Sequence, residues 1–507
     1  MDDATLDLAW AAAWKDFLAN KVQHAERRAA PFLISLPTVL KEAEQGSSSH
    51  EAALADRLVT LADLAHIAGA ARGCRATLEM AIAAYDAHLA RAPLNSGARR
   101  MRAETLMRCQ QYAAAFEGFN GVYQRSLCDD DGAPRTTDEV APFQLIHDAE
   151  CVEHAVRQGA DASHLRTAEG WRELAEALIR SASTDPNADH ADDAAKLRRH
   201  KVASMTAAQC TLLGSHGQPL PLPPSSVGTG AEVGHVTTAL NPDIDWAAAS
   251  RAYISERVVV IDDLLEPQAL AAIQAYARHG AHFRTLRNGY LGAFPGDGTT
   301  HPLILALVRE LTTAAPAIFS SHALALWWIF KYDETNPAGI GIHADPAAVN
   351  INLWLTDDQA CLEGGGLTIY SHVPALEQPT QAVNHEFASS KAEAAFRDEL
   401  SAGGKVCTIP YRCNRAAIFV SDQYHESLPF RFASGYENRR ANLTLLFGDR
   451  WSPLERGARD VEGAMRTAET SPAAGSEAGG GIGAGAGGGH VVSEPGAGSN
   501  DGWDVFG

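Results

Sequence analysis

The residues of this chain best suited to holding a metal ion are two histidines and an aspartate. His343 and Asp345 stand two positions apart in "GIGIHADPAAVNINLWL", residues 339–355, and His425 follows in "SDQYHESLPF". On an extended segment, residues two apart point to the same side. Two imidazoles and one carboxylate on one face of an iron ion leave three coordination positions open, which suits a bidentate cosubstrate and dioxygen.

A His-x-Asp pair is weak evidence when it stands alone. The chain has 20 histidines, so such a pair is expected by chance, and most histidines are surface or satisfied core residues. His372 and His385 are rival ligands between His343 and His425. We expect neither to bind the metal, since His372 follows the strand-like "LTIYS" and His385 lies in a polar, helix-like insertion.

The surrounding sequence predicts the β-structure that would position these residues. From about residue 243 onward, short apolar runs alternate with turn residues, which is typical of an antiparallel sandwich or barrel. The runs include "ALALWWIFKY", "VNINLWLT", "LTIYSHV", "KVCTIPY", "AAIFVS" and "ANLTLLFG". We assign this β domain to residues 243–450.

The N-terminal residues 1–212 show apolar residues at three- and four-residue spacing and predict an all-α domain. Ala81 and Tyr85 recur one 34-residue step later as Ala115 and Phe119. This period resembles a tetratricopeptide repeat (TPR), with an unspecialised helical bundle as the alternative. Residues 213–242 form a linker rich in proline and glycine, and the glycine-rich residues 451–507 are expected to be disordered.

Composition narrows the classes of partner. The 62 acidic residues outnumber the 42 Lys and Arg, for a net charge of −20, and no basic patch is evident, so nucleic acid is not expected as a partner. The chain shows neither a secretory signal nor an apolar run long enough to span a membrane, which predicts a cytoplasmic protein without a membrane partner. The eight scattered cysteines contain no C-x-x-C pair and are expected to be reduced thiols.

The order of the motifs in the β domain carries more information than each motif alone. Tyr332 ends an aromatic strand, and "HAD" follows at 343–345. Next come "GGGL" at 364–367, "HESLP" at 425–429 and "RRANLTLLF" at 439–447. This order, over residues 250–448, resembles the iron(II)- and 2-oxoglutarate-dependent dioxygenases, in the branch that is similar to prolyl 4-hydroxylases.

The resemblance implies a double-stranded β-helix of jelly-roll type with His343, Asp345 and His425 as iron ligands. It also implies Fe(II), 2-oxoglutarate as cosubstrate and dioxygen, with ascorbate as an optional addition. Two neutral imidazoles and one carboxylate leave Fe(II) a single positive charge, which suits a dianionic chelator. Relatives that halogenate have a small residue in place of the carboxylate, so the presence of Asp345 points to hydroxylation.

The far carboxylate of 2-oxoglutarate needs a cation, and arginine can bind a carboxylate through two parallel hydrogen bonds. Arg431, Arg439 and Arg440 are the candidates. The family pattern selects Arg440, and strand alternation places Arg440, Asn442 and Thr444 on one face, opposite Arg439. Arg431 and Arg439 are expected in surface ion pairs or at a solvated edge.

Other residues are expected to line the cosubstrate pocket. On the strand after the His-x-Asp, Asn350, Asn352 and Trp354 share one face, which suits a pocket that holds polar ligand atoms. Similar proteins often carry tyrosine where Trp354 stands, and core packing is the alternative role for Trp354. Tyr332 is expected to contact the cosubstrate or the iron site, with a purely structural role as the alternative.

Together these features predict an enzyme that couples oxidative decarboxylation of 2-oxoglutarate to hydroxylation of a substrate C–H bond. The resemblance favours a protein or peptide substrate over a small molecule, for example a proline side chain, which repeat-like helices could recruit. One alternative is a helical-repeat interaction protein with an inactive β domain. Another is a cupin-like metal protein that is not an oxygenase, which would need an additional ligand and no arginine reserved for a carboxylate.

Overall fold

The computed structural model describes most of the chain. The described residues are 3–45, 51–127, 139–182, 195–213, 216, 220, 238–279, 282–287, 289–332, 339–376, 378, 384 and 390–450. Most of the expected linker, His385 and the expected disordered tail, 451–507, lie outside these ranges. Among the described residues, no helix combines the length and the apolar character needed to cross a bilayer.

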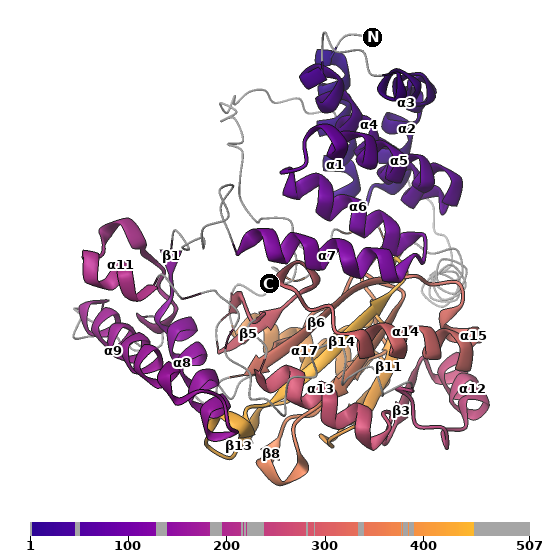
Figure 1. Ribbon diagram of the computed structural model, residues 1–507. Coiled ribbons are helices and arrows are strands. Elements are labelled where there is room, and N and C mark those ends of the chain that lie inside the picture. The colour runs from indigo at the N-terminus through magenta and orange to yellow at the C-terminus, as the bar shows by residue number, and fades with distance from the viewer. Residues whose placement is uncertain are drawn as a thin grey trace, which may run out of the picture.

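The N-terminal part is helical (Figure 1). Its helices are α1 (Asp3–Leu18), α2 (Val22–Ala29), α3 (Leu36–Glu44), α4 (Glu51–Arg72), α5 (Arg75–Arg91), α6 (Ser96–Arg108), α7 (Tyr112–Ser126), α8 (Pro142–Arg157), α9 (Leu165–Ala182) and α11 (Ala207–Leu213). Ala81 and Tyr85 are buried on α5, and Ala115 and Phe119 are buried on α7. These positions suit core-facing residues of packed helices, and the TPR assignment stays a prediction.

Small residues allow the N-terminal helices to pack closely. The central part of α4, "LADLAHIAGA", is buried on nearly every side. Adding a Cβ atom to Gly69 would bring it within 2.8 Å of Leu78 on α5, so this helix pair requires glycine at the contact. The side chain of Asn95 caps α6 by accepting a hydrogen bond from the Ala98 N–H.

The C-terminal part is built from antiparallel strands. The strands are β3 (Val258–Ile261), β4 (Thr285–Arg287), β5 (Tyr290–Ala293), β6 (Leu324–Tyr332), β7 (Val349–Trp354), β8 (Cys361–Gly364), β9 (Leu367–Tyr370), β10 (Val406–Ile409), β11 (Ala416–Val420), β12 (His425–Ser427), β13 (Phe430–Phe432) and β14 (Ala441–Phe447). A separate pair, β1 (Glu139–Val140) and β2 (His200–Lys201), lies among the helices.

Seven strands form the main sheet in the order β3-β11-β7-β14-β6-β5-β4. A three-stranded sheet, β10-β9-β12, and the pair β13-β8 make up the smaller β-structure. The expected fold class is therefore observed as a helical N-terminal part with a large antiparallel sheet in the C-terminal part. The finer jelly-roll description stays a prediction.

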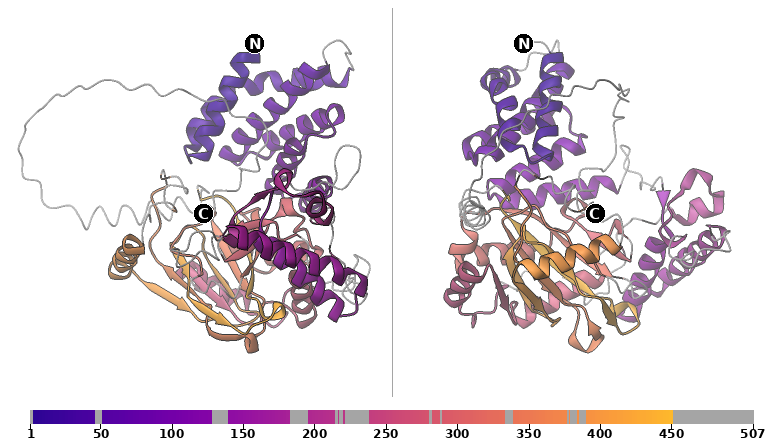
Figure 2. Two further views of the ribbon diagram at one scale, coloured as in Figure 1. Left: turned by 90° about the vertical axis from the view of Figure 1, so that its left-hand side faces the viewer. Right: turned by 180° about the vertical axis from the view of Figure 1, so that it is seen from behind.

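The main sheet has one face that is covered by helices. The helices of the C-terminal part are α12 (Trp246–Glu256), α13 (Pro267–His279), α14 (Pro302–Ala314), α15 (Pro316–Phe319) and α17 (Ser390–Gly403). One apolar cluster joins Ile273 of α13, Leu307 of α14 and Ile351 of the sheet. In the rear view, α17 crosses the opposite side of the β-structure (Figure 2, right).

The apolar core of this sheet continues into the N-terminal helices. Phe116 of α7 stacks on Trp327 of β6 with ring centroids 4.7 Å apart. Tyr112 accepts a hydrogen bond from the Leu324 N–H, and Arg108 of α6 pairs with Asp449 at 2.6 Å. The element type changes near residue 212, but the buried core extends across that boundary, so α6 and α7 cover part of the sheet.

Alternation along the strands separates two chemical environments. The register pairs Asn442 of β14 with Trp354 of β7, and Thr444 with Asn352. These residues share one face, while Leu443 and Leu353 belong to the helix-covered core on the other. The polar face therefore lies on the side of the sheet away from α13 and α14.

Candidate metal centre

The structure brings His343, Asp345 and His425 together. His343 precedes β7 and His425 begins β12, and the two form an isolated antiparallel bridge with N–O distances of 2.9 and 2.8 Å. Their ring centroids are 4.2 Å apart. One potential ligand atom from each of the three residues lies within 4.8 Å of the other two. This spacing is small enough for one ion to contact all three side chains.

Both imidazole rings are held in the same protonation pattern. The Nδ1 atom of His343 is 2.8 Å from the Gly341 carbonyl oxygen, and that of His425 is 2.8 Å from the Gln423 carbonyl oxygen. Because a carbonyl only accepts hydrogen bonds, each Nδ1 must carry the proton. Each Nε2 atom therefore keeps its lone pair for a metal, which is the arrangement expected of histidine ligands.

The charges in the cluster also suit a cation. Burial, with His425 nearby, lowers the pKa of His343 to about 4. Burial by itself would raise the pKa of Asp345, but the two nearby histidines, His425 first, and the hydrogen bond from the Asn350 amide outweigh it and hold this pKa below its usual value. Near neutral pH the cluster thus offers a neutral His343 imidazole and an ionised carboxylate, the forms that bind metal.

Asn350 has a role that its place in the sequence did not reveal. Its Nδ2 atom donates a 2.8 Å hydrogen bond to Oδ2 of Asp345. Asn350 is fully buried at the start of β7. Strand alternation groups it with the residues that face the cosubstrate, whereas its amide here orients the carboxylate that would bind the metal.

Arg440 is a buried cation without a carboxylate partner among the described residues. It is 2 % exposed, and its Nη2 donates to the Gly365 carbonyl at 3.1 Å, while Nε and Nη1 have no partner in the described ranges. Its guanidinium stacks 4.4 Å from the centre of the Tyr332 ring. An uncompensated buried charge is costly unless a ligand completes the site, so the residues present fit a carboxylate-bearing cosubstrate.

Further unpaired polar atoms lie on the same face of the sheet. Trp354 is completely buried, and within the described part of the chain its Nε1 donor and the Oδ1 atoms of Asn352 and Asn442 have no partner. Tyr332 packs between Arg440 and Tyr290, whose ring centroid is 5.1 Å away. Trp354, Asn352 and Tyr332 therefore lie where a polar ligand beside Arg440 could contact them.

Helix α17 supports the cluster from outside the sheets, and its contribution was missed in the sequence. Glu393 accepts a 3.0 Å hydrogen bond from the Ile342 N–H, directly before His343. Arg397 forms an ion pair with Glu426, directly after His425, at 2.6 Å. The only signal in the sequence was the four-residue spacing of Glu393 and Arg397, which is common on solvated helices.

The remaining candidates take other positions. Arg439 pairs with Glu150 of α8 at 2.6 Å, and its side chain is buried rather than solvated as expected. The physical reason is that α8 packs against this end of β14. Arg431 is 62 % exposed and lies 3.6 Å from Glu363. His372 is not part of the three-residue cluster.

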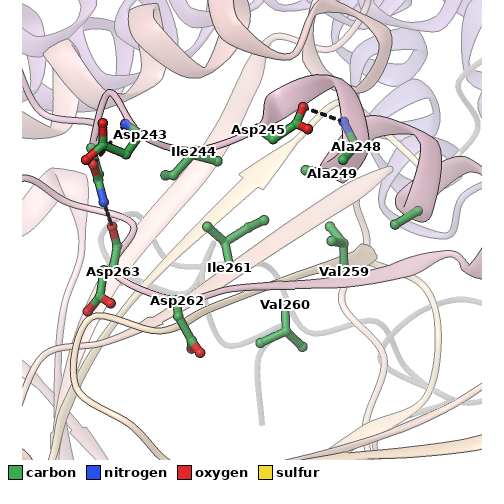
Figure 3. A pocket seen from close by; sticks show the side chains of 12 residues that line it. Asp243, Ile244, Asp245, Ala248, Ala249, Val259, Val260, Ile261, Asp262 and Asp263 are labelled. Carbon is green, nitrogen blue, oxygen red and sulfur yellow. Dashed lines mark hydrogen bonds between the residues drawn. The ribbon is translucent and has the colours of Figure 1, made fainter.

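A separate pocket of about 440 Å³ lies between α12 and the edge strand β3 (Figure 3). Three of its four carboxylates, those of Asp245, Asp262 and Asp263, have partners within the fold. Asp245 caps α12 at the Ala248 N–H, and Asp262 pairs with Arg415 at 2.5 Å. This pocket contains none of the residues expected to bind metal or cosubstrate, so we do not connect it with the candidate metal centre.

The chain matches no family model and no curated protein. Solved structures do resemble part of it. The non-heme alpha ketoglutarate dependent epimerase SnoN from nogalamycin biosynthesis is 15% identical over 40% of this chain and 83% of its own, with a TM-score of 0.31. A Pseudomonas putida prolyl-4-hydroxylase is 17% identical over 42% of this chain and 95% of its own, with a TM-score of 0.28.

A third similar structure is HygX from Streptomyces hygroscopicus with nickel and 2-oxoglutarate bound. It is 12% identical over 40% of this chain and 87% of its own, with a TM-score of 0.28. The similar structures thus include an alpha ketoglutarate dependent epimerase, a prolyl-4-hydroxylase and a protein with nickel and 2-oxoglutarate bound.

Proposed function

We propose that this protein is an Fe(II)- and 2-oxoglutarate-dependent dioxygenase that hydroxylates a substrate C–H bond. One observation carries the proposal. A His-Asp-His cluster whose Nδ1 hydrogen bonds leave both Nε2 atoms available to a metal shares a face of the sheet with a buried arginine that has no carboxylate partner among the described residues. A metal site and an anion site on one face of the sheet are what a chelating dicarboxylate requires.

Each residue of the site has a separate proposed role. His343, Asp345 and His425 would hold the iron, and Asn350 would keep the carboxylate oriented. Arg440 would bind the far carboxylate of 2-oxoglutarate, and Trp354 would add its Nε1 donor. When bound, iron with 2-oxoglutarate and dioxygen supplies the oxidising chemistry, in which decarboxylation to succinate accompanies C–H hydroxylation. The buried surroundings limit access of water to this site.

The alternatives from other classes fit the site less well. Among the described residues the cluster has three ligands and no fourth, which leaves coordination positions for a cosubstrate. A cupin-like protein that is not an oxygenase would have no use for the buried Arg440. An inactive interaction domain would have no reason to keep all three ligands and the arginine together.

We extend the proposal to a protein or peptide substrate, such as a proline side chain. It is supported by the motifs that resemble prolyl 4-hydroxylases and by the N-terminal helices α6 and α7, which share a core with the catalytic sheet. The test supplies proline-containing peptides and free amino acids to the iron-loaded protein and follows succinate. Stimulation by free amino acids alone would reject a peptide substrate.

The central experiment follows succinate after oxygen is admitted to protein loaded anaerobically with Fe(II) and 2-oxoglutarate. We expect slow turnover even without the true substrate, and its loss in His343→Ala. The matched control is His372→Ala, which removes a nearby histidine outside the cluster and should leave turnover unchanged. Failure of the wild-type protein to bind either iron or 2-oxoglutarate would overturn the proposal.

A further inference from the structure

One short turn contacts two of the three candidate ligands. It joins β11 to β12 and comprises residues 421–424. The Asp345 N–H donates to the Ser421 carbonyl at 3.2 Å, and the Ser421 hydroxyl donates to the Asp345 carbonyl at 3.3 Å. Two residues later, the Gln423 carbonyl accepts from His425 Nδ1. The conformation of this turn therefore fixes the backbone of Asp345 and the ring of His425 at the same time.

The turn is anchored by an ion pair in the protein interior. Asp422 lies 3.2 Å from Arg450, and their side chains are 1 % and 0 % exposed. Arg450 also donates to the Gln378 carbonyl at 2.7 Å and to the Ala375 carbonyl at 3.1 Å. Because Arg450 follows β14, the pair connects the end of a central strand with the turn that carries the metal ligands.

A buried ion pair has a strong geometric preference. Removing one partner leaves an uncompensated charge, so the surrounding backbone must move or admit water. Here the backbone next to Asp422 contains the Gln423 carbonyl, which keeps the proton on Nδ1 of His425. Loss of that hydrogen bond would allow the ring to rotate or to carry its proton on Nε2, which cannot then bind a metal.

We propose that Asp422 and Arg450 are positioning residues for the metal centre, acting through the 421–424 turn on His425 and Asp345. The inference rests on the proposed metal-binding function of the three-residue cluster. Neither residue needs to contact the metal. Hydrogen-bonding partners that orient metal ligands typically contribute about 10- to 100-fold to metal affinity.

The test measures Co(II) affinity by chelator competition, together with the visible absorption spectrum of bound Co(II). Asp422→Asn keeps the side-chain shape and removes its charge. We expect its Co(II) affinity to fall about 10- to 100-fold with an altered spectrum. Arg450→Lys keeps the positive charge and should retain more affinity than Arg450→Met. Ser421→Ala, which removes only the hydroxyl contact with Asp345, should cause a smaller loss.

The matched control is Asp148→Asn. Asp148 is also fully buried and paired with an arginine, Arg284, at 3.1 Å, but it belongs to a network on α8 away from the cluster. We expect this variant to lose stability while keeping wild-type Co(II) affinity and spectrum. Equal losses of affinity in Asp148→Asn and Asp422→Asn would overturn the proposal, as would wild-type binding by Asp422→Asn.

One more variant, His343→Ala, separates this inference from the proposed function. If His343→Ala binds Co(II) as the wild type does, the cluster is not the metal centre and both ideas fail. If His343→Ala loses Co(II) while Asp422→Asn, Arg450→Lys and Arg450→Met all bind it normally, only the positioning role fails. Should Asp422→Asn not fold, the comparison of Arg450→Lys with Ser421→Ala and Asp148→Asn still decides the question.

Discussion

Buried cations on the two faces of strands β14 and β6 differ in the partners that the fold gives them. Arg439 and Arg440 are neighbours in the chain, yet Arg439 pairs with Glu150 on the helix-covered side, while Arg440 has no carboxylate among the described residues. On β6, Lys331 points toward the helices and Tyr332 toward the metal side. Alternation alone sends these neighbours into different environments.

The helix-covered face satisfies its charges internally. Lys331 donates to the Tyr436 hydroxyl at 2.8 Å and to Nε2 of His147 at 3.2 Å. His147 in turn bonds to Asp148, which also pairs with Arg284. Burial, with the Lys331 charge, lowers the pKa of His147 to about 3, and burial lowers the pKa of Lys331 to about 7. Every member has a partner within the chain.

The opposite face of the sheet, here called the metal face, has polar atoms that are available to a ligand. Arg440 and Trp354 have donors there without a partner among the described residues, and the Nδ1 hydrogen bonds of His343 and His425 leave their Nε2 atoms for a metal. Burial of charge therefore does not by itself mark a functional site. What marks it is the missing counter-charge, since a fold without ligand would lose stability by keeping such a group buried.

The largest effect is expected from a substitution of Lys331, in the hydrogen-bonded network on the helix-covered face. In the unfolded chain Lys331 has its ordinary pKa of 10.5, against about 7 in the folded protein. Between these pH values the unfolded state binds more protons, so wild-type stability gains from this residue as pH rises and loses as pH falls toward 7. Lys331→Met removes this dependence. We expect the difference in unfolding free energy between variant and wild type to change by about 4 kcal/mol across the window.

Urea unfolding of both proteins at a series of pH values measures this difference. At pH 7 and below, the wild type bears the full cost of burying the charge. There the unfolding free energy of the variant should be highest relative to that of the wild type. Co(II) and 2-oxoglutarate binding should be unchanged, because the network lies on the other face. A difference that stays constant with pH would show that Lys331 is already charged in the folded protein.

Next in size is Arg440→Ala on the metal face. Loss of charge-assisted hydrogen bonds worth about 3 kcal/mol should weaken 2-oxoglutarate binding about 100-fold. Metal affinity should change little, since Arg440 is not a ligand. Calorimetry on the Ni(II)-loaded protein without oxygen measures both. The control Arg439→Ala should lower stability by breaking the Glu150 pair but preserve 2-oxoglutarate binding; equal loss in both variants would contradict the assignment.

A smaller effect is expected from Trp354→Phe. This change keeps an aromatic ring and removes the unpaired Nε1 donor, so 2-oxoglutarate binding should weaken about 5-fold, for a hydrogen bond of about 1 kcal/mol. The same substitution at Trp327 gives the matched comparison on the helix-covered face, where Nε1 donates to the Thr299 carbonyl at 2.6 Å. Trp327→Phe should reduce stability only. Unchanged 2-oxoglutarate binding in Trp354→Phe would assign Trp354 to core packing.

The smallest effect should come from Arg431→Ala. Its side chain is exposed and its contact with Glu363 is long, and exposed ion pairs contribute about 0–1 kcal/mol. Stability and 2-oxoglutarate affinity should both remain within error of the wild type in the same calorimetric and urea experiments. A large loss of 2-oxoglutarate affinity would move the carboxylate site from Arg440 to Arg431.

Several parts of this picture could be predicted from the sequence because they depend on short spacing. The His-x-Asp pair and the strand alternation are local, so the shared face of Asn352 and Trp354 could be inferred before any coordinates. The partner of a buried side chain is not local. Glu150 lies far from Arg439 in the chain, and only the packing of α8 on the end of β14 brings them together.

The expected boundary between the helical and β domains shows the same limit. Composition changes near residue 212, and periodicity changes with it. The apolar core does not follow that change, because Phe116 on α7 stacks on Trp327 of the sheet. Spacing within a helix indicates which residues are buried but not which surface they pack against.

By itself the sequence determined the identity and order of the candidate ligands, the type of each half of the chain and the face of each strand residue. These follow from spacing and side-chain chemistry. Only the folded chain shows that His343 and His425 present Nε2, that Asn350 holds Asp345, and that Arg439 has a counter-charge whereas Arg440 has none among the described residues. Those facts depend on hydrogen-bond partners from distant segments, which only the folded chain brings within reach.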